Sequence, residues 1–118
     1  MKSKALTQQI DTWAADHRAA LATLTSAEQN YLHAVASTAL TRARAEQRVR
    51  TETTAKQTEG AIAMAVALDA EVLASEQARL MAESALIAAK NAVEASRATK
   101  AALAWHVALV TMPSESAA

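Results

Sequence analysis

The chain has 118 residues, with one glycine, one proline and no cysteine, and its 12 basic and 12 acidic residues give a net charge of zero. These counts exclude disulfides and cysteine zinc sites, and a neutral chain has no overall field that draws it to nucleic acid or anionic lipid. Hydrophobic residues make up 52%, but the 33 alanines leave about 24% for larger apolar side chains. Because alanine favours helix and buries little area, the composition predicts long, closely packed helices. The scarcity of turn residues argues against a sheet.

The N-terminal segment, MKSKALTQQIDTW, has two lysines but no apolar run that would make a signal peptide. The longest uncharged apolar stretch is far shorter than the ~20 residues of a membrane-spanning helix. We therefore expect a soluble, cytoplasmic protein with no transmembrane segment, and export by a leaderless route stays open.

A first helix is predicted over about residues 4–57. Large side chains recur in its first part at intervals that are mostly three and four residues, which is typical of an amphipathic helix. The row consists of Leu6, Ile10, Trp13, His17, Leu21, Leu24, Tyr31 and Val35. The stretch Thr25-Ser-Ala-Glu28 has the form of a capping box, so a division of this half into two helices stays open.

A turn is predicted over about residues 57–60. The segment Lys56-Gln-Thr-Glu-Gly60 contains the one glycine of the chain, and glycine is the residue that most often follows a helix end. In a helical hairpin closed at about residue 60, facing residues have numbers that sum to about 120.

The next stretch, GAIAMAVAL (residues 60–68), alternates alanine with larger apolar residues in the manner of a β-strand. A lone strand would have no partner in a chain that is otherwise helical. On a helix, Ile62 and Val66 lie on one side and Met64 and Leu68 on the other. The alternation is then a by-product of the alanines between them, and we predict a helix.

This second helix is predicted over about residues 61–112, with Pro113 ending it and residues 113–118 as a C-terminal tail. It carries two apolar faces. The first face is formed by Ile62, Val66, Leu73, Leu80, Ile87, Ala98, Trp105, Leu109 and Met112, and the second by Met64, Leu68, Leu86, Val93 and Val107. A helix that is apolar all round must be buried all round, and a single partner helix cannot achieve this.

The predicted fold is therefore all-α: a long, alanine-rich, antiparallel two-helix hairpin over residues 1–112, similar to a coiled coil. Three or more helices, or one continuous rod, are the alternatives. Because extensive apolar patches are unusual on soluble monomers, we expect a homo-oligomer or a helical protein partner. The predicted interface residues are Trp13, Ile62, Met64, Val66, Leu68, Leu73, Leu80, Leu86, Ile87, Val93 and Trp105.

Two charge blocks support the hairpin. At the predicted register Arg44 faces Glu76, and Arg50 faces the pair Asp69 and Glu71. Exposed pairs contribute little energy but help to set register and orientation. The same pairing can also form between chains.

The arginine-rich segment 42–50 has a second interpretation, because four arginines in nine residues can hold a phosphate backbone. On a helix these arginines spread round the axis, and no aromatic residue lies between them for base stacking. We therefore favour charge pairing over contact with nucleic acid.

Catalytic chemistry has little support in the sequence. His17 and His106, with Asp16 or Asp11, form a candidate metal group, but a histidine at the edge of a narrow core is the favoured interpretation. No HExxH spacing, nucleophile elbow or phosphate-binding loop is present. We expect no enzyme activity, no cofactor and no metal.

These expectations indicate a structural or interaction protein: a helical coiled-coil subunit, adaptor or stalk of a larger assembly, such as a bacterial secretion apparatus or a phage-like particle. The first alternative is a small nucleic-acid-binding hairpin dimer that uses residues 42–50. The second is a helix that associates with a membrane surface through GAIAMAVAL.

Overall fold

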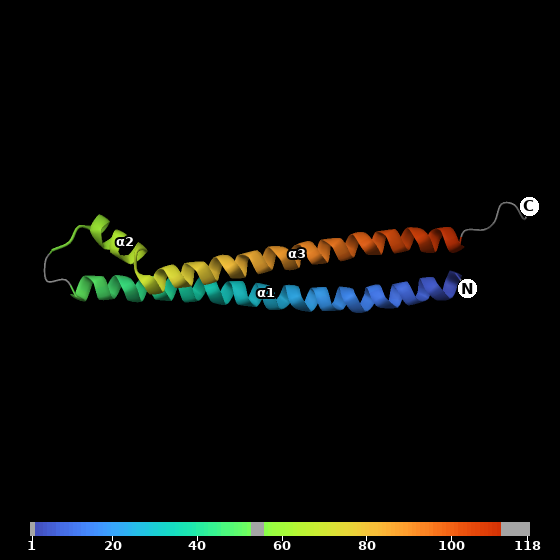
Figure 1. Cartoon of the computed structure of the whole chain (residues 1–118), viewed down its shortest axis with the longest axis horizontal. Coiled ribbons are helices and arrows are strands. Elements are labelled where there is room, and N and C mark those ends of the chain that lie inside the picture. Colours follow the sequence, from blue (N-terminus) through green and yellow to red (C-terminus); the bar gives the residue numbers. More distant parts are fainter. Residues whose placement is uncertain (1, 53–55, 112–118) are drawn as a thin grey trace, which may run out of the picture. The chain divides into compact units, whose positions relative to one another are not determined.

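The computed structural model describes residues 2–52 and 56–111, and every regular element in these ranges is a helix. Helix α1 spans Lys2–Glu52, α2 spans Glu59–Ala67 and α3 spans Ala70–Thr111. Helices α1 and α3 run antiparallel (Figure 1). The predicted all-α helical hairpin is confirmed.

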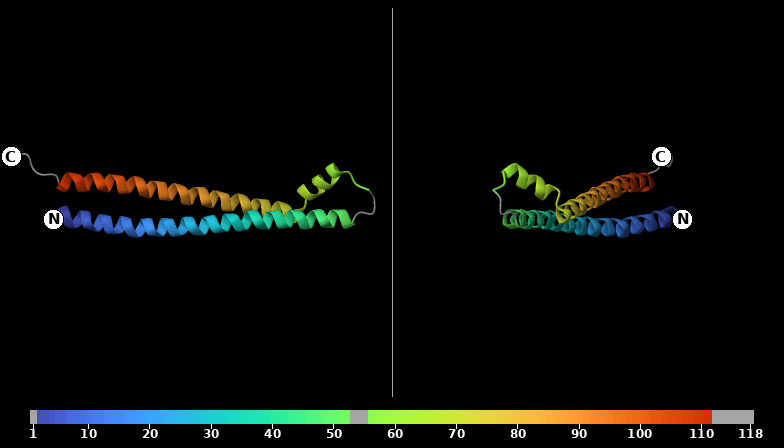
Figure 2. Two further views of the ribbon diagram at one scale, coloured as in Figure 1. Left: turned by 180° about the vertical axis from the view of Figure 1, so that it is seen from behind. Right: turned by 60° about the vertical axis from the view of Figure 1, so that its left-hand side comes forward.

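The hairpin consists of two compact units. In the terminal unit (Met1–Thr25 with Ala88–Ala118), the first half of α1 packs on the second half of α3. In the central unit (Ser26–Ile87), the rest of α1 packs on α2 and on the start of α3. Figure 2 shows from two directions that α2 is angled away from the axis of α3.

Each long helix buries one row of residues, spaced alternately by three and four, and we call these two rows the seam. The α1 row is Trp13, His17, Ala20, Leu24, Ala27, Tyr31, Ala34, Thr38, Thr41 and Ala45, all buried or half-buried. The α3 row is Val72, Ser75, Arg79, Ala82, Leu86, Ala89, Val93 and Ser96, again buried or half-buried. A mean spacing of 3.5 residues keeps one face of each helix toward its partner.

Small seam residues bring the two backbones close together. In the central unit the hydroxyl of buried Thr38 lies 3.2 Å from the backbone carbonyl of Ser75. In the terminal unit the ring of His17 reaches the hydroxyl of Ser96 at 2.7 Å. Both pairs have residue numbers that sum to 113, so the predicted register of about 120 is wrong by seven residues, which is about two helical turns.

Helix α1 continues without a break through the capping-box pattern at residues 25–28. The Thr25 hydroxyl donates a hydrogen bond to the carbonyl of Leu21 one turn earlier, at 3.1 Å. A hydroxyl that bonds back in this way does not cap a new helix. The division of the first half, which the sequence left open, does not occur at this point.

The predicted turn at 57–60 differs from the structure, and this difference explains the register error. Helix α1 ends at Glu52, and residues 56–58 are non-helical. Thr58 is the N-cap of α2, because its hydroxyl accepts a hydrogen bond from the Ala61 amide at 3.1 Å. Gly60 lies in the first turn of α2 with an ordinary negative φ. It therefore does not follow a helix end.

The prediction of one helix over 61–112 is also wrong, because a break at Leu68 and Asp69 separates α2 from α3. The Asp69 carboxylate accepts hydrogen bonds from the amides of Glu71 and Val72, at 2.9 and 3.2 Å. Aspartate is among the best N-cap residues, so α3 begins there. The GAIAMAVAL stretch is helical as predicted. The predicted stop at Pro113 and the tail 113–118 lie outside the described residues.

We expect the Asp69→Ala variant to lose about 1 kcal/mol of stability, because two amides at the start of α3 lose their acceptor. Thermal melts followed by circular dichroism measure this loss. The control is Asp69→Asn, which keeps an oxygen acceptor for both amides and removes the charge that Arg48 binds. Equal melting temperatures for Asp69→Ala and the wild type would contradict the capping role.

Candidate interaction surfaces

The arginines of α1 pair with acidic residues of the central unit. Arg42 binds Glu76 of α3, with its Nη2 2.6 Å and its Nε 2.9 Å from the same carboxylate oxygen. Arg48 reaches Asp69 at 3.2 Å and Glu71 at 3.5 Å. These contacts join α1 to the start of α3.

Arg50 has a different set of partners. It binds Glu46 one turn earlier on α1 at 2.9 Å and Glu59 at the start of α2 at 2.8 Å. Its hydrogen bond to Glu59 lowers the pKa of that carboxyl. The hydrogen bonds that the Arg50 guanidinium donates to Glu59 and Glu46 raise its pKa.

The two charge blocks thus face each other as predicted, but the individual partners are wrong. Glu76 binds Arg42 and Arg79 rather than Arg44. Asp69 and Glu71 bind Arg48 rather than the predicted Arg50. The cause is the turn, since it closes earlier than Gly60 and shifts the facing residues along α1.

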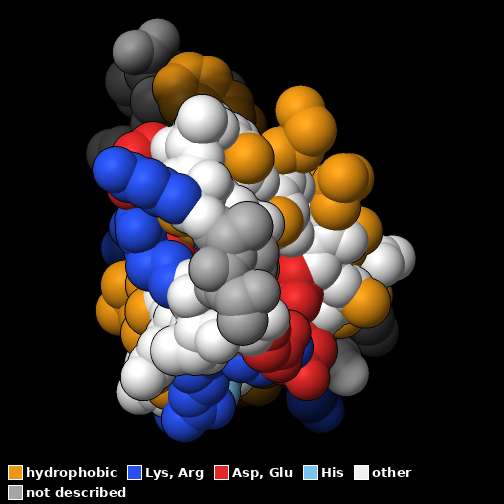
Figure 3. Space-filling model, turned by 90° about the vertical axis from the view of Figure 1, so that its left-hand side faces the viewer, with side chains coloured by type: hydrophobic (Ala, Val, Ile, Leu, Met, Phe, Trp, Pro, Cys, Tyr) orange, Lys and Arg blue, Asp and Glu red, His pale blue; other side chains and the backbone are white. Residues whose placement is uncertain are grey.

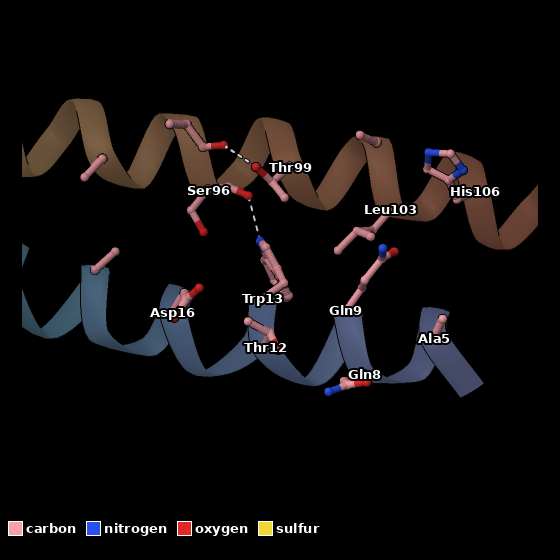
Figure 4. Close-up of a pocket in the computed structure, with 14 residues that line it drawn as sticks. Ala5, Gln8, Gln9, Thr12, Trp13, Asp16, Ser96, Thr99, Leu103 and His106 are labelled. Carbon is pink, nitrogen blue, oxygen red and sulfur yellow. Dashed lines mark hydrogen bonds between the residues drawn. The ribbon is translucent and has the colours of Figure 1, made fainter. Parts of the chain in front are cut away.

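A cluster of three side chains, Trp13, His17 and Lys100, joins the helices of the terminal unit. Figure 4 shows the contact of Trp13 with Ser96. The Trp13 indole N–H donates a hydrogen bond to the backbone carbonyl of Ser96 at 2.8 Å. His17 stacks on Trp13 with ring centres 4.8 Å apart, and the Lys100 ammonium lies 5.8 Å from the Trp13 ring centre. At the predicted register of about 120 Trp13 would face Val107, but in the structure it lies at Ser96.

An open groove of about 840 Å³ lies along one side of this cluster. Its lining is mostly small or uncharged: Ala5, Gln8, Gln9, Thr12, Trp13, Asp16, Ala20, Ala92, Ala95, Ser96, Thr99, Ala102, Leu103 and His106. Asp16 is the only carboxylate among these residues. Across the described ranges 2–52 and 56–111, no three His, Asp or Glu side chains come together as a metal site.

The outward side of α3 in the central unit reverses the usual distribution of charge. Between Val72 and Ile87 the three charged residues, Glu76, Arg79 and Glu83, are half-buried. Every exposed residue in that range is uncharged: Leu73, Ala74, Gln77, Ala78, Leu80, Met81, Ser84, Ala85 and Ile87. We call these nine residues the outward face. Leu73 and Leu80 are each 53% exposed, and Ile87 is 52% exposed.

The two predicted apolar faces of the second half have different positions in the structure: one contributes to the seam and the other points outward. Leu86 and Val93, which we predicted at an interface with a partner, are buried in the seam. Leu73, Leu80 and Ile87 of the other face point outward. Both faces carry large aliphatic residues, so hydrophobicity alone does not determine which one pairs with α1.

The apolar helix α2 is covered on one side only. Ile62 is buried and Val66 half-buried, whereas Met64 and Leu68 remain exposed. Figure 3 looks onto the end of the molecule that α2 occupies, and hydrophobic side chains gather on the side away from the Lys and Arg side chains. In the terminal unit Trp105 is 67% exposed.

No protein-family model, curated protein or solved structure matches this chain. No helix in the described part of the chain is long and apolar enough to cross a membrane. The arguments for function therefore come from the arrangement of the side chains alone.

The Glu76→Gln variant should lose stability at neutral pH but not in acid. The hydrogen bonds from Arg42 and Arg79 hold the pKa of Glu76 below its ordinary value. A depressed carboxyl pKa stabilises the fold above the unfolded value of about 4.3, and this contribution disappears as the pH falls through the folded value. The melting temperatures of the variant and of the wild type should converge as the pH is lowered from 7 to 3. The control is Glu94→Gln, which breaks only an exposed pair with Arg97 on the same helix.

The Trp13→Phe variant should lose about 1 kcal/mol, because the hydrogen bond to the Ser96 carbonyl cannot form. The matched control is Trp105→Phe at an exposed position, which should change stability by less than about 0.5 kcal/mol. Urea unfolding of both variants measures the difference. Equal losses would show that the indole N–H contact does not hold the terminal unit together.

Proposed function

We propose that this chain is a non-enzymatic structural protein: a helical coiled-coil subunit, adaptor or stalk of a larger, cytoplasmic assembly. A bacterial secretion apparatus or a phage-like particle is the kind of assembly that such a hairpin suits. Its partner is another copy of the chain or a helical protein.

The observation that carries this proposal is the reversed charge distribution on α3. A helix that faces only water has charged residues outside and apolar residues inside. Between Val72 and Ile87 the three charged residues of α3 are half-buried, with Glu76 bound to Arg42 of α1, and the exposed residues include leucine, isoleucine and methionine. Exposed apolar surface of this extent marks an interaction site on a soluble protein.

The terminal unit supports the same proposal with a weaker feature. Trp105 is two-thirds exposed, and tryptophan is enriched in the residues that dominate binding energy at interfaces. Trp13, in contrast, is engaged within the unit by Ser96 and His17. Trp105 is therefore the better candidate for an anchor.

Binding of nucleic acid, the first alternative, has less support because three of the four arginines in segment 42–50 form ion pairs within the chain. Arg42, Arg48 and Arg50 each bind at least one carboxylate. A phosphate would have to displace these carboxylates. The carboxylates belong to the same chain, so they bind without the loss of translational freedom that a separate ligand undergoes. Salt-dependent binding of RNA or DNA to the folded chain would favour this alternative. Flotation with liposomes would favour the membrane-surface alternative instead.

The Leu80→Glu variant should reduce the mass of the assembly while leaving the helix content unchanged, because Leu80 lies outside the seam. Light scattering at tens of micromolar gives the mass, and circular dichroism gives the helix content. The control is Ala36→Glu, at an exposed position of α1 that also lies outside the seam. A wild-type chain that is monomeric and binds no hydrophobic dye would contradict the proposal.

A further inference from the structure

We propose that the outward face of α3 binds the same face of a second copy of this chain. The two α3 helices pack antiparallel about a two-fold axis that passes beside Leu80. This inference deepens the function proposed above and rests on it, since it names the partner of the exposed face.

The spacing of the large residues suits a symmetric pair. Leu73, Leu80 and Ile87 are each seven residues apart, which places them in one row at intervals of about 10.5 Å. Because Leu80 is the midpoint of this row, an antiparallel arrangement sets Leu80 against Leu80 of the second copy. Leu73 then meets Ile87 of the second copy at both ends. An interface in which one patch meets itself is the rule for two-fold dimers.

The polar residues of the face fit the same arrangement. Gln77 lies within one residue, about 1.5 Å along the axis, of the level of Ser84 of the second copy, so an amide and a hydroxyl come close enough to satisfy each other. The other exposed residues between Leu73 and Ile87 are three alanines and Met81. The outward face itself contains no charged residue that has to lose its water when the two copies meet. Among the three charged residues of this stretch, Glu83 has the most exposed side chain, at 44%.

The charges beside the face do not oppose the pairing. The two-fold axis brings Glu76 within one residue, about 1.5 Å along the axis, of the level of Glu83 of the second copy, which would set two carboxylates near each other. Arg42 and Arg79 bind Glu76 at 2.6 and 3.0 Å, and Arg79 also lies 3.6 Å from Glu83. Each copy therefore neutralises its own carboxylates, and like-charge repulsion between the copies is small.

The available area places this dimer among the smaller specific interfaces. The large side chains Leu73, Leu80, Met81 and Ile87 are each about half exposed or more. Only Leu73, Leu80 and Ile87, with Gln77 and Ser84 beside them, can contact one partner helix, because Met81 and the alanines lie about 100° or more round α3 from Leu80. The area buried per copy is therefore below the ~800 Å² of a standard interface. Pairing should therefore be detectable at tens of micromolar.

Single cysteine variants test the arrangement, because the natural chain has no cysteine. Under mild oxidation Leu80→Cys should form a disulfide dimer about tenfold faster than the control Ala36→Cys, since only adjacent Cβ atoms can be bridged. Leu73→Cys and Ile87→Cys should each cross-link slowly alone. An equimolar mixture of the two should form the mixed dimer at a rate close to that of Leu80→Cys.

Rapid cross-linking of Leu73→Cys with itself would overturn the antiparallel arrangement, because it requires parallel helices. If Leu80→Cys cross-links no faster than Ala36→Cys, the outward face does not bind a second copy of the chain. If the wild-type chain then still binds a hydrophobic dye, the face remains open for another helical protein and the proposed function survives. If it binds no dye, both proposals fail. Circular dichroism of each variant confirms that it is folded.

Discussion

The close approach of two alanine-rich helices is the constraint on which the hairpin depends. Side chains of α1 reach backbone carbonyls of α3 in both units, from Trp13 to Ser96 and from Thr38 to Ser75. Such contacts require a small residue at the acceptor position, because a larger side chain would hold the helices apart. The small residues also limit the apolar area that the seam buries. Directional polar contacts therefore matter more here than in a thick core.

The ion pairs follow from the same geometry. With small residues in the seam, the half-buried positions beside it are close enough for Arg42 to reach across to Glu76. These pairs draw the charges of α3 toward α1, and the opposite side of α3 is left without any charge between Val72 and Ile87. Internal charge pairing and an exposed apolar face are thus two results of one arrangement.

Much of this fold is predictable from the sequence, because alanine content and the lack of breakers favour helices strongly. The sequence also predicts that GAIAMAVAL is helical and that the two charge blocks face each other. The residues of α3 that form the seam could not be predicted. Leu86 and Val93 are about as hydrophobic as Leu80 and Ile87, so hydrophobicity alone does not show which pair faces α1. The deciding signal is the row of small or polar residues, such as Ser75 and Ser96, that permits close packing. Asp69 was missed as a cap because it stands between apolar stretches.

The short helix α2 affects the order in which the parts of the molecule unfold. It has nine residues, and isolated helices shorter than ~12 residues are marginal in water. It is retained by the burial of Ile62, the cap at Thr58 and an exposed ion pair between Arg50 and Glu59. Amide hydrogens of α2 should therefore exchange with solvent well before those of the paired parts of α1 and α3. The hairpin has a segment beside its bend that can unfold alone while the long helices stay together.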